Sequence, residues 1–152
     1  MTHKELAWKA IVEVEQSEIF VFPQGMVGFP DTNDFVMLNS GHGDIVCMQA
    51  TDRAEAAFLL TPWDEHRLGE SPKLTSDQLA CLQCQDENKL LWLLVLNPFS
   101  DVKWVSANLR APVAINLDSS LGMQCIQANP KLDLHFQWIR QPDPAQQAAE
   151  AC

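Results

Sequence analysis

Strand-sized apolar runs, separated by glycine, proline or charged residues, most constrain how this chain can fold. A helix would need apolar residues recurring every three or four positions over a longer window, whereas strands are usually about five or six residues long. Residues 10–15 also alternate late in their run, as a half-buried strand does. We predict further strands at residues 18–22, 35–38, 45–50, 56–61, 90–96, 102–107, 112–117 and 123–128.

A capping signal marks one helix. Thr75 stands three positions before Gln78, so the hydroxyl and the amide side chain can each bond the other's backbone N–H group. We therefore predict a helix at about residues 76–82 and a charged connection at 64–69. Many short strands with little helix predict a mainly β, single-domain, antiparallel β-barrel-like fold with one or two short helices. A β-sandwich is the alternative.

The length of the chain indicates how many domains it forms, and its charge indicates which partners it favours. The 152 residues suit one domain, which we place at residues 1–140. Residues 141–152 have no large apolar side chain, and we expect this tail to be disordered. Twenty acidic against ten basic residues give a formal charge of −10, which repels nucleic acid and favours a basic protein partner. Without a signal peptide or a membrane-length apolar run, we expect a cytoplasmic protein that does not bind membranes, most simply a monomer.

The chemistry-bearing residues do not form a recognisable catalytic, cofactor or metal motif. Cys81 and Cys84 form a C-x-x-C pair, but a structural zinc site needs two further ligands at suitable spacing. The sequence lacks both the G-x-S-x-G nucleophile turn and the G-x-G-x-x-G dinucleotide turn. We therefore predict no catalytic residue, no metal site and no cofactor, and we interpret residues 64–66 as a solvated loop.

Two alternatives remain open from the residues alone. Cys47 paired with His42 or His135 would make a small enzyme with a Cys/His-lined pocket. The tryptophans on strand-like runs would alternatively suit a barrel that holds a small ligand. Of the five tryptophans, Trp63 is the one we expect to be partly exposed, because it follows Pro62 and precedes a charged segment.

Three segments stand in a characteristic order. Residues 25–29 read GMVGF, residues 48–62 begin MQATD and end AFLLTP, and residues 108–124 contain NLRAPVAIN followed by GMQ. Between about residues 20 and 126 the chain resembles the FliW family, whose glycine–phenylalanine turn, Leu-Gln-Ser…Phe…Pro segment and Asn-Leu-x-Ala-Pro…Ile-Asn…Gly-x-Gln signature these segments match. The sequence beyond Pro130 and the C-x-x-C pair depart from that pattern.

The resemblance implies a β-barrel-like flagellar assembly factor without catalytic activity. Members of the family bind flagellin and also CsrA, the RNA-binding translational repressor of flagellin messenger. Free FliW engages CsrA away from its RNA surface, and accumulating flagellin captures FliW, so repression returns. The resemblance also singles out five residues for partner binding, with a structural role open for each: Phe29, Asn108, Pro112, Asn116 and Gln124. For Gly28, which we expect to let backbones approach closely, the structural role is favoured.

Overall fold

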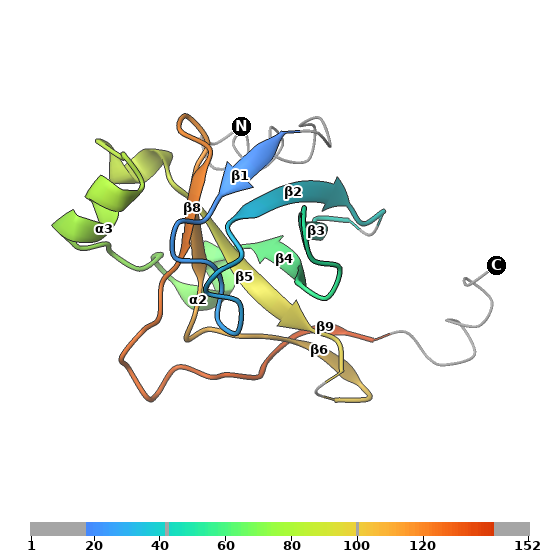
Figure 1. The fold of residues 1–152 in the computed structure, drawn as a ribbon. Coiled ribbons are helices and arrows are strands. Elements are labelled where there is room, and N and C mark those ends of the chain that lie inside the picture. The colour runs from blue at the N-terminus through green and yellow to red at the C-terminus, as the bar shows by residue number, and fades with distance from the viewer. Residues whose placement is uncertain (1–17, 42, 100, 142–152) are drawn as a thin grey trace.

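The computed structural model describes residues 18–41, 43–99 and 101–141 of the chain. The predicted strand at residues 10–15 and the tail from residue 142 onward lie outside the described residues. Nine strands, numbered β1 to β9, form one sheet in this part of the chain, with two short α-helices and a 3-10 turn beside it (Figure 1).

Seven of the described strands close into a barrel. The order around the ring is β4-β3-β2-β1-β8-β7-β5, and β5 returns to pair with β4. β6 and β9 continue the sheet from one end of β5 as a two-stranded wing. The bounds are β1 Ile19–Val21, β2 Asp34–Asn39, β3 Val46–Ala50, β4 Ala57–Pro62, β5 Leu91–Asn97, β6 Trp104–Ala107, β7 Val113–Asn116, β8 Leu121–Gln124 and β9 Phe136–Arg140. The predicted barrel-like fold is confirmed.

One pairing in the barrel is parallel. β1 meets β8 through Val21 and Leu121, and the Val21 N–H donates to the Ser120 carbonyl at 2.8 Å. All other neighbours in the ring are antiparallel. A closed ring with an odd number of strands cannot alternate direction throughout, so at least one parallel pair is unavoidable.

Near the C-terminus, sequence reasoning misplaced one strand and missed another. The strand expected at residues 123–128 is β8, which begins at Leu121, because residues 117–120 form a tight turn with Ser120 at φ +56°. The side chain of Asn116 supports that turn by accepting from the Asp118 N–H at 3.1 Å. We predicted no strand at β9, which pairs with β6 across a register shift at Val105/Ser106.

The helical elements lie on the connections outside the barrel. The predicted helix is α3, Ser76–Cys81, and both bonds of its capping box are present. The interpretation of residues 64–66 as a loop was wrong: they lead into α2, Glu65–Leu68, because the Asp64 side chain caps it by accepting from the His66 N–H. A 3-10 turn, η1, covers Glu87–Lys89. No helix in the described residues has the length and apolarity to cross a membrane.

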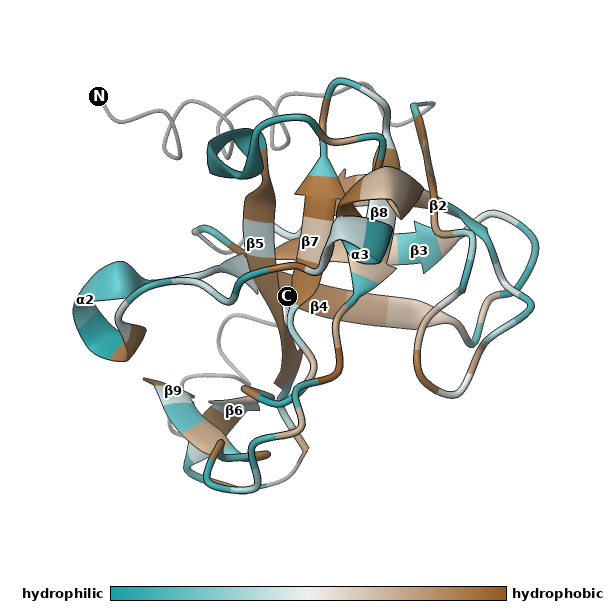
Figure 2. Ribbon diagram, turned by 90° about the vertical axis from the view of Figure 1, so that its left-hand side faces the viewer, coloured by the Kyte–Doolittle hydropathy of each residue, from teal (hydrophilic) through white to brown (hydrophobic). Residues whose placement is uncertain are grey.

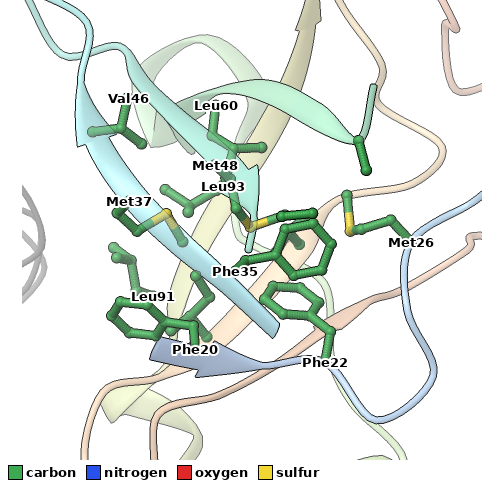
Figure 3. Packing of buried hydrophobic residues seen from close by; sticks show 14 residues of the cluster. Phe20, Phe22, Met26, Phe35, Met37, Val46, Met48, Leu60, Leu91 and Leu93 are labelled. Atoms are coloured by element: carbon green, nitrogen blue, oxygen red, sulfur yellow. The ribbon is translucent and has the colours of Figure 1, made fainter. Parts of the chain in front are cut away.

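The barrel interior is the main hydrophobic core. Fourteen buried residues from the strands, the loop between β1 and β2 and the turn between β3 and β4 fill it, as Figure 3 shows. Phe22 and Phe35 pack edge to face with ring centroids 5.3 Å apart, a favourable aromatic geometry. Two smaller clusters bury the outer faces, one beneath α3 and one beneath the wing. In Figure 2 the hydrophobic colour follows much of β5 and β7, and residues on both faces of β5 are buried.

Candidate functional site

The first loop, between β1 and β2, is fastened to the end of β8 by Gln124. The Val27 N–H donates to the Gln124 Oε1 atom at 2.8 Å, and the Gln124 Nε2 atom donates to the Ala111 carbonyl at 3.2 Å. Gln124 therefore joins three segments that are far apart in the sequence. Its side chain is half-buried.

Gly25, and not Gly28, provides the close approach of backbones in this loop. A Cβ at Gly25 would overlap the carbonyl oxygen of Phe29, whereas open space surrounds Gly28. Gly28 has φ +89° in the turn that lets Met26 and Phe29 pair, so glycine suits it for conformational reasons. The expectation for Gly28 was wrong in its detail, because the crowded point lies three residues earlier.

Phe29 is half-buried and anchors the same loop on the barrel. Its ring meets the Phe58 ring edge to face, with centroids 5.9 Å apart. Val27 stands at the tip with 59% of its surface exposed. Phe29, one of the five residues predicted to bind a partner, therefore lies in the same loop as the exposed apolar side chain of Val27.

Asn108 and Pro112 shape the connection from β6 to β7. The Asn108 side chain accepts from the Arg110 N–H at 2.9 Å, and the Pro112 carbonyl accepts from the Cys125 N–H at 2.7 Å. Arg110 then donates from Nε to the Leu132 carbonyl at 2.6 Å, which holds the long segment after β8. Asn108 is half-buried and Pro112 is buried.

Asn116 lies at the opposite end of β7 from Pro112. Its Nδ2 atom donates to the Leu82 carbonyl at 2.9 Å, and its side chain is only 5% exposed. Asn116 thereby attaches the C-terminal end of α3 to the barrel. The structure groups Phe29, Pro112 and Gln124 near one end of the β7–β8 hairpin and places Asn116 at the other. Partner binding by these residues stays a prediction.

The thiols of Cys47 and Cys125 are not set up as nucleophiles. Burial raises the pKa of the Cys125 thiol to about 11, despite a backbone hydrogen bond from Ala114 that lowers it. Burial also raises the pKa of Cys47. A reactive cysteine needs a lowered pKa, so both shifts disfavour the Cys/His enzyme alternative. His42, one of the proposed partners, lies outside the described residues.

The C-x-x-C pair is divided between surface and core. Cys81 is exposed at the end of α3, while Cys84 packs against the cluster beneath that helix and donates from Sγ to the Asp86 carbonyl at 3.2 Å. In the described part of the chain, no three His, Cys, Asp or Glu residues come close enough to hold a metal ion.

Sequence reasoning missed a polar pocket between α2 and η1. Its volume is about 280 Å³, and Trp92 and Leu90 of the buried strand region form part of its lining. Glu87 lies 17 positions beyond Glu70 and 22 beyond Glu65 with no characteristic spacing, so only the folded structure brings the three glutamates around one pocket. Trp63, predicted to be partly exposed, is half-buried nearby and donates from Nε1 to the Gly69 carbonyl at 2.9 Å.

The length of the chain that matches a family model shows to which family the chain belongs. The sequence model of the FliW protein family matches residues 6–138, nearly the whole chain. The chain belongs to the FliW family. The resemblance noted for residues 20–126 is confirmed, and the match extends beyond it at both ends.

Curated relatives and one solved structure agree with this membership. The flagellar assembly factor FliW of Borreliella burgdorferi strain B31 is 28% identical over 128 residues, covering 84% of this chain and 98% of that protein. The FliW of Thermoanaerobacter pseudethanolicus is 26% identical over 121 residues, covering 78% and 81%. A crystal structure of the flagellar assembly factor FliW matches with a TM-score of 0.72 at 24% identity, covering 88% of this chain and 92% of that one, which supports the fold. These relatives are named as assembly factors and not as enzymes.

Proposed function

We propose that this FliW-family protein is a cytoplasmic flagellar assembly factor that binds flagellin and CsrA in alternation. The observation that carries the proposal is the family match over residues 6–138, supported by relatives that align over nearly their full length. When flagellin is scarce, the protein holds CsrA and the flagellin messenger is translated. When flagellin accumulates, it takes the protein away from CsrA, and repression resumes.

The charge of the chain favours this type of partner. A net charge of −10 opposes direct contact with RNA and speeds encounter with a basic RNA-binding protein. The filled barrel core favours recognition by a preformed surface, because a closely packed interior resists remodelling. Exchange then follows from competing affinities and concentrations, with no large conformational change in the barrel.

The five residues named by the resemblance divide by accessibility. Phe29, Asn108 and Gln124 are half-exposed and can touch a partner, whereas Pro112 and Asn116 are buried. We propose that Phe29 and Gln124 lie at a binding surface around the β1–β2 loop and that Asn108 extends it along the β6–β7 connection. Pro112 supports this surface from below, whereas Asn116 has a structural role at the other end of β7, where it holds α3.

A competition experiment tests the proposal. The purified full-length chain is titrated by calorimetry with CsrA and, separately, with flagellin from the same organism, and the FliW–CsrA complex is then challenged with flagellin. Binding to both proteins, with flagellin displacing CsrA, is the expected result. Light scattering during size-exclusion chromatography should show a monomer before partners are added. Failure to bind either protein would contradict the proposal.

A further inference from the structure

The turn between β5 and β6 carries two large apolar side chains that stand in solvent. Phe99 is 92% and Val102 is 90% exposed, more than any other large apolar side chain in the described part of the chain. The turn lies where the wing of β6 and β9 reaches farthest from the barrel (Figure 1). A single exposed apolar residue is ordinary, but two within four positions form a patch of the kind that marks interaction sites.

Hydrogen bonds from side chains hold the backbone of this turn. The Asn97 side chain accepts from the Phe99 N–H at 2.8 Å, and the Asp101 side chain accepts from the Lys103 N–H at 2.6 Å. Gln141, which follows β9, donates from Nε2 to the Asp101 carbonyl at 2.7 Å and from its N–H to the Lys103 carbonyl at 2.7 Å. The apolar pair is therefore presented on a turn that is already ordered, which lowers the cost of binding.

Basic side chains flank the apolar pair in an otherwise acidic protein. Lys103 follows Val102 directly, and Arg140 pairs with Trp104 across the wing. The side chains of Lys103 and Arg140 are both exposed. Asp101 is the one acidic residue in the two segments that form this part of the wing, residues 97–107 and 136–141. The wing thus differs in charge from the molecule as a whole, in which acidic residues outnumber basic ones two to one.

This local charge selects the kind of partner. Lys103 and Arg140 repel a basic protein, which is attracted instead to the acidic remainder of the molecule. A second copy of the chain carries the same net charge of −10, so two copies repel one another. An apolar groove with acidic side chains along its rim matches both the apolar pair and the basic residues beside it.

We propose that Phe99, Val102, Lys103 and Arg140, together named the wing tip, dock into an acidic-rimmed apolar groove of a protein partner. Naming that partner as flagellin rests on the function proposed above, because CsrA, the other partner, is basic. Phe99 supplies the aromatic anchor that commonly dominates the binding energy of an interface. Flagellin held at the wing tip can still exclude CsrA, since bound proteins extend well beyond their contact residues.

Calorimetry with flagellin and CsrA from the same organism tests the apolar pair. Phe99→Ser/Val102→Ser should weaken flagellin binding at least tenfold and leave CsrA affinity nearly unchanged. The fold should persist, because both side chains are exposed. Ile19→Ser/Leu134→Ser, which removes two half-exposed apolar side chains elsewhere, is the matched control and should leave both affinities nearly unchanged. Flagellin affinity that is equal in the two double variants would overturn the wing tip.

Reversing the basic residues tests the chemistry of the groove. Lys103→Glu/Arg140→Glu should weaken flagellin binding about tenfold at low salt. Lys73→Glu/Lys89→Glu, which changes the net charge equally at exposed positions elsewhere, should have a much smaller effect. Equal losses in both charge-reversed variants would show that only the net charge matters and would overturn the acidic rim.

Other occupants of the wing tip give different results. Light scattering during size-exclusion chromatography would show a dimer that Phe99→Ser abolishes, if the wing tip bound a second copy. Sedimentation with phosphatidylcholine–phosphatidylglycerol vesicles would remove the unaltered chain, but not Phe99→Ser, if it bound lipid. Either result would overturn the proposed occupant. If the unaltered chain bound no flagellin, the proposed function and the named partner would fail together, whereas flagellin binding that ignores Phe99→Ser/Val102→Ser would contradict the wing tip alone.

Discussion

At the scale of single residues, polar side chains in this protein form hydrogen bonds to the backbone of distant segments that are not paired as strands. Asn116 reaches the Leu82 carbonyl across 34 positions, and Gln124 reaches the Val27 N–H group across 97. A buried backbone group left without a partner costs about 1–3 kcal/mol, which applies to the buried Leu82 carbonyl that Asn116 reaches. The bond from Val27 to Gln124 is exposed, so its contribution is to hold the first loop in place. Matching a family at such positions therefore does not by itself distinguish a binding role from a structural one.

The contact between β8 and the Phe22 ring predicts a sensitive position. A Cβ at Gly122 would overlap that ring, which is fully buried in the barrel core. We expect Gly122→Ala to lower the free energy of unfolding by about 1–3 kcal/mol, measured by urea denaturation. Adding Phe22→Leu should recover part of the loss, because the smaller side chain makes room. Purely additive costs in the double variant would show that the overlap is not the cause.

The buried thiol of Cys125 predicts a loss of stability at alkaline pH. Its pKa is raised to about 11 in the folded protein from an ordinary 9.0, so the unfolded chain loses this proton first. The stabilising contribution is complete below pH 9 and falls as the pH rises toward 11. Urea denaturation across this range should show a steeper decline for the unaltered protein than for Cys125→Ala. Identical slopes would contradict the prediction.

At the scale of elements, α2 and β9 depend on each other through Arg67. The register shift between β6 and β9 leaves Trp138 without a partner on β6, and Arg67 donates to the carbonyls of Trp138 and Gln137 at 3.0 and 2.8 Å. The guanidinium also lies over the rings of Phe136 and Trp138, at 5.2 and 4.2 Å from their centroids. Because β9 is the last strand of the described sheet, Arg67 also covers part of an open edge.

Substituting Arg67 should separate the effect of shape from that of charge. Lysine keeps the charge but cannot donate to two carbonyls in a fork while stacking on the rings, so we expect Arg67→Lys to cost about 1–2 kcal/mol of stability. Arg53→Lys is the matched control, since the Arg53 guanidinium makes an exposed contact with Glu55 at 3.9 Å and its backbone bonds are unaffected by the substitution. Urea denaturation of both variants checks this, and equal stabilities would contradict a specific role for Arg67.

At the scale of the whole molecule, an acidic surface is carried by a rigid, closed sheet. The ring of seven strands has no free edge of its own, and only the wing of β6 and β9 extends beyond it. Fifteen acidic and eight basic residues lie in the described part of the chain, so most of the formal charge of −10 is carried by this closed scaffold. A negatively charged protein with a preformed surface suits a basic partner that is first attracted over a long range and then makes direct contacts with that surface.

Ionic strength should thus act mainly on the rate of encounter with CsrA. Stopped-flow measurements between 0.05 and 0.5 M salt should show the association rate constant falling by about tenfold or more, with a smaller change in dissociation. As a control, flagellin should still displace CsrA from the complex at one fixed salt concentration, which shows that the complex is intact under the conditions used. An association rate that is independent of salt would contradict electrostatic steering.

The sequence by itself determined most of the fold and the family. Alternating and continuous apolar runs place β1 to β7 because side-chain periodicity is a local property, and the α3 cap is a contact between residues three positions apart. The matched segments identify the family, since they contain the turn and hairpin residues that the fold requires. The local signal failed at β8, where the left-handed turn at Ser120 moved the strand, and at β9, whose pairing lies outside its own segment.

Only the tertiary structure decided how distant segments meet. The odd ring with its parallel β1–β8 pair, the crowding of Gly122 by Phe22 and the fork of Arg67 on β9 all join residues far apart in sequence. The acidic pocket between α2 and η1 arises in the same way. No periodicity or spacing along the chain records such contacts, because they depend on barrel closure, and closure is a property of the whole sheet.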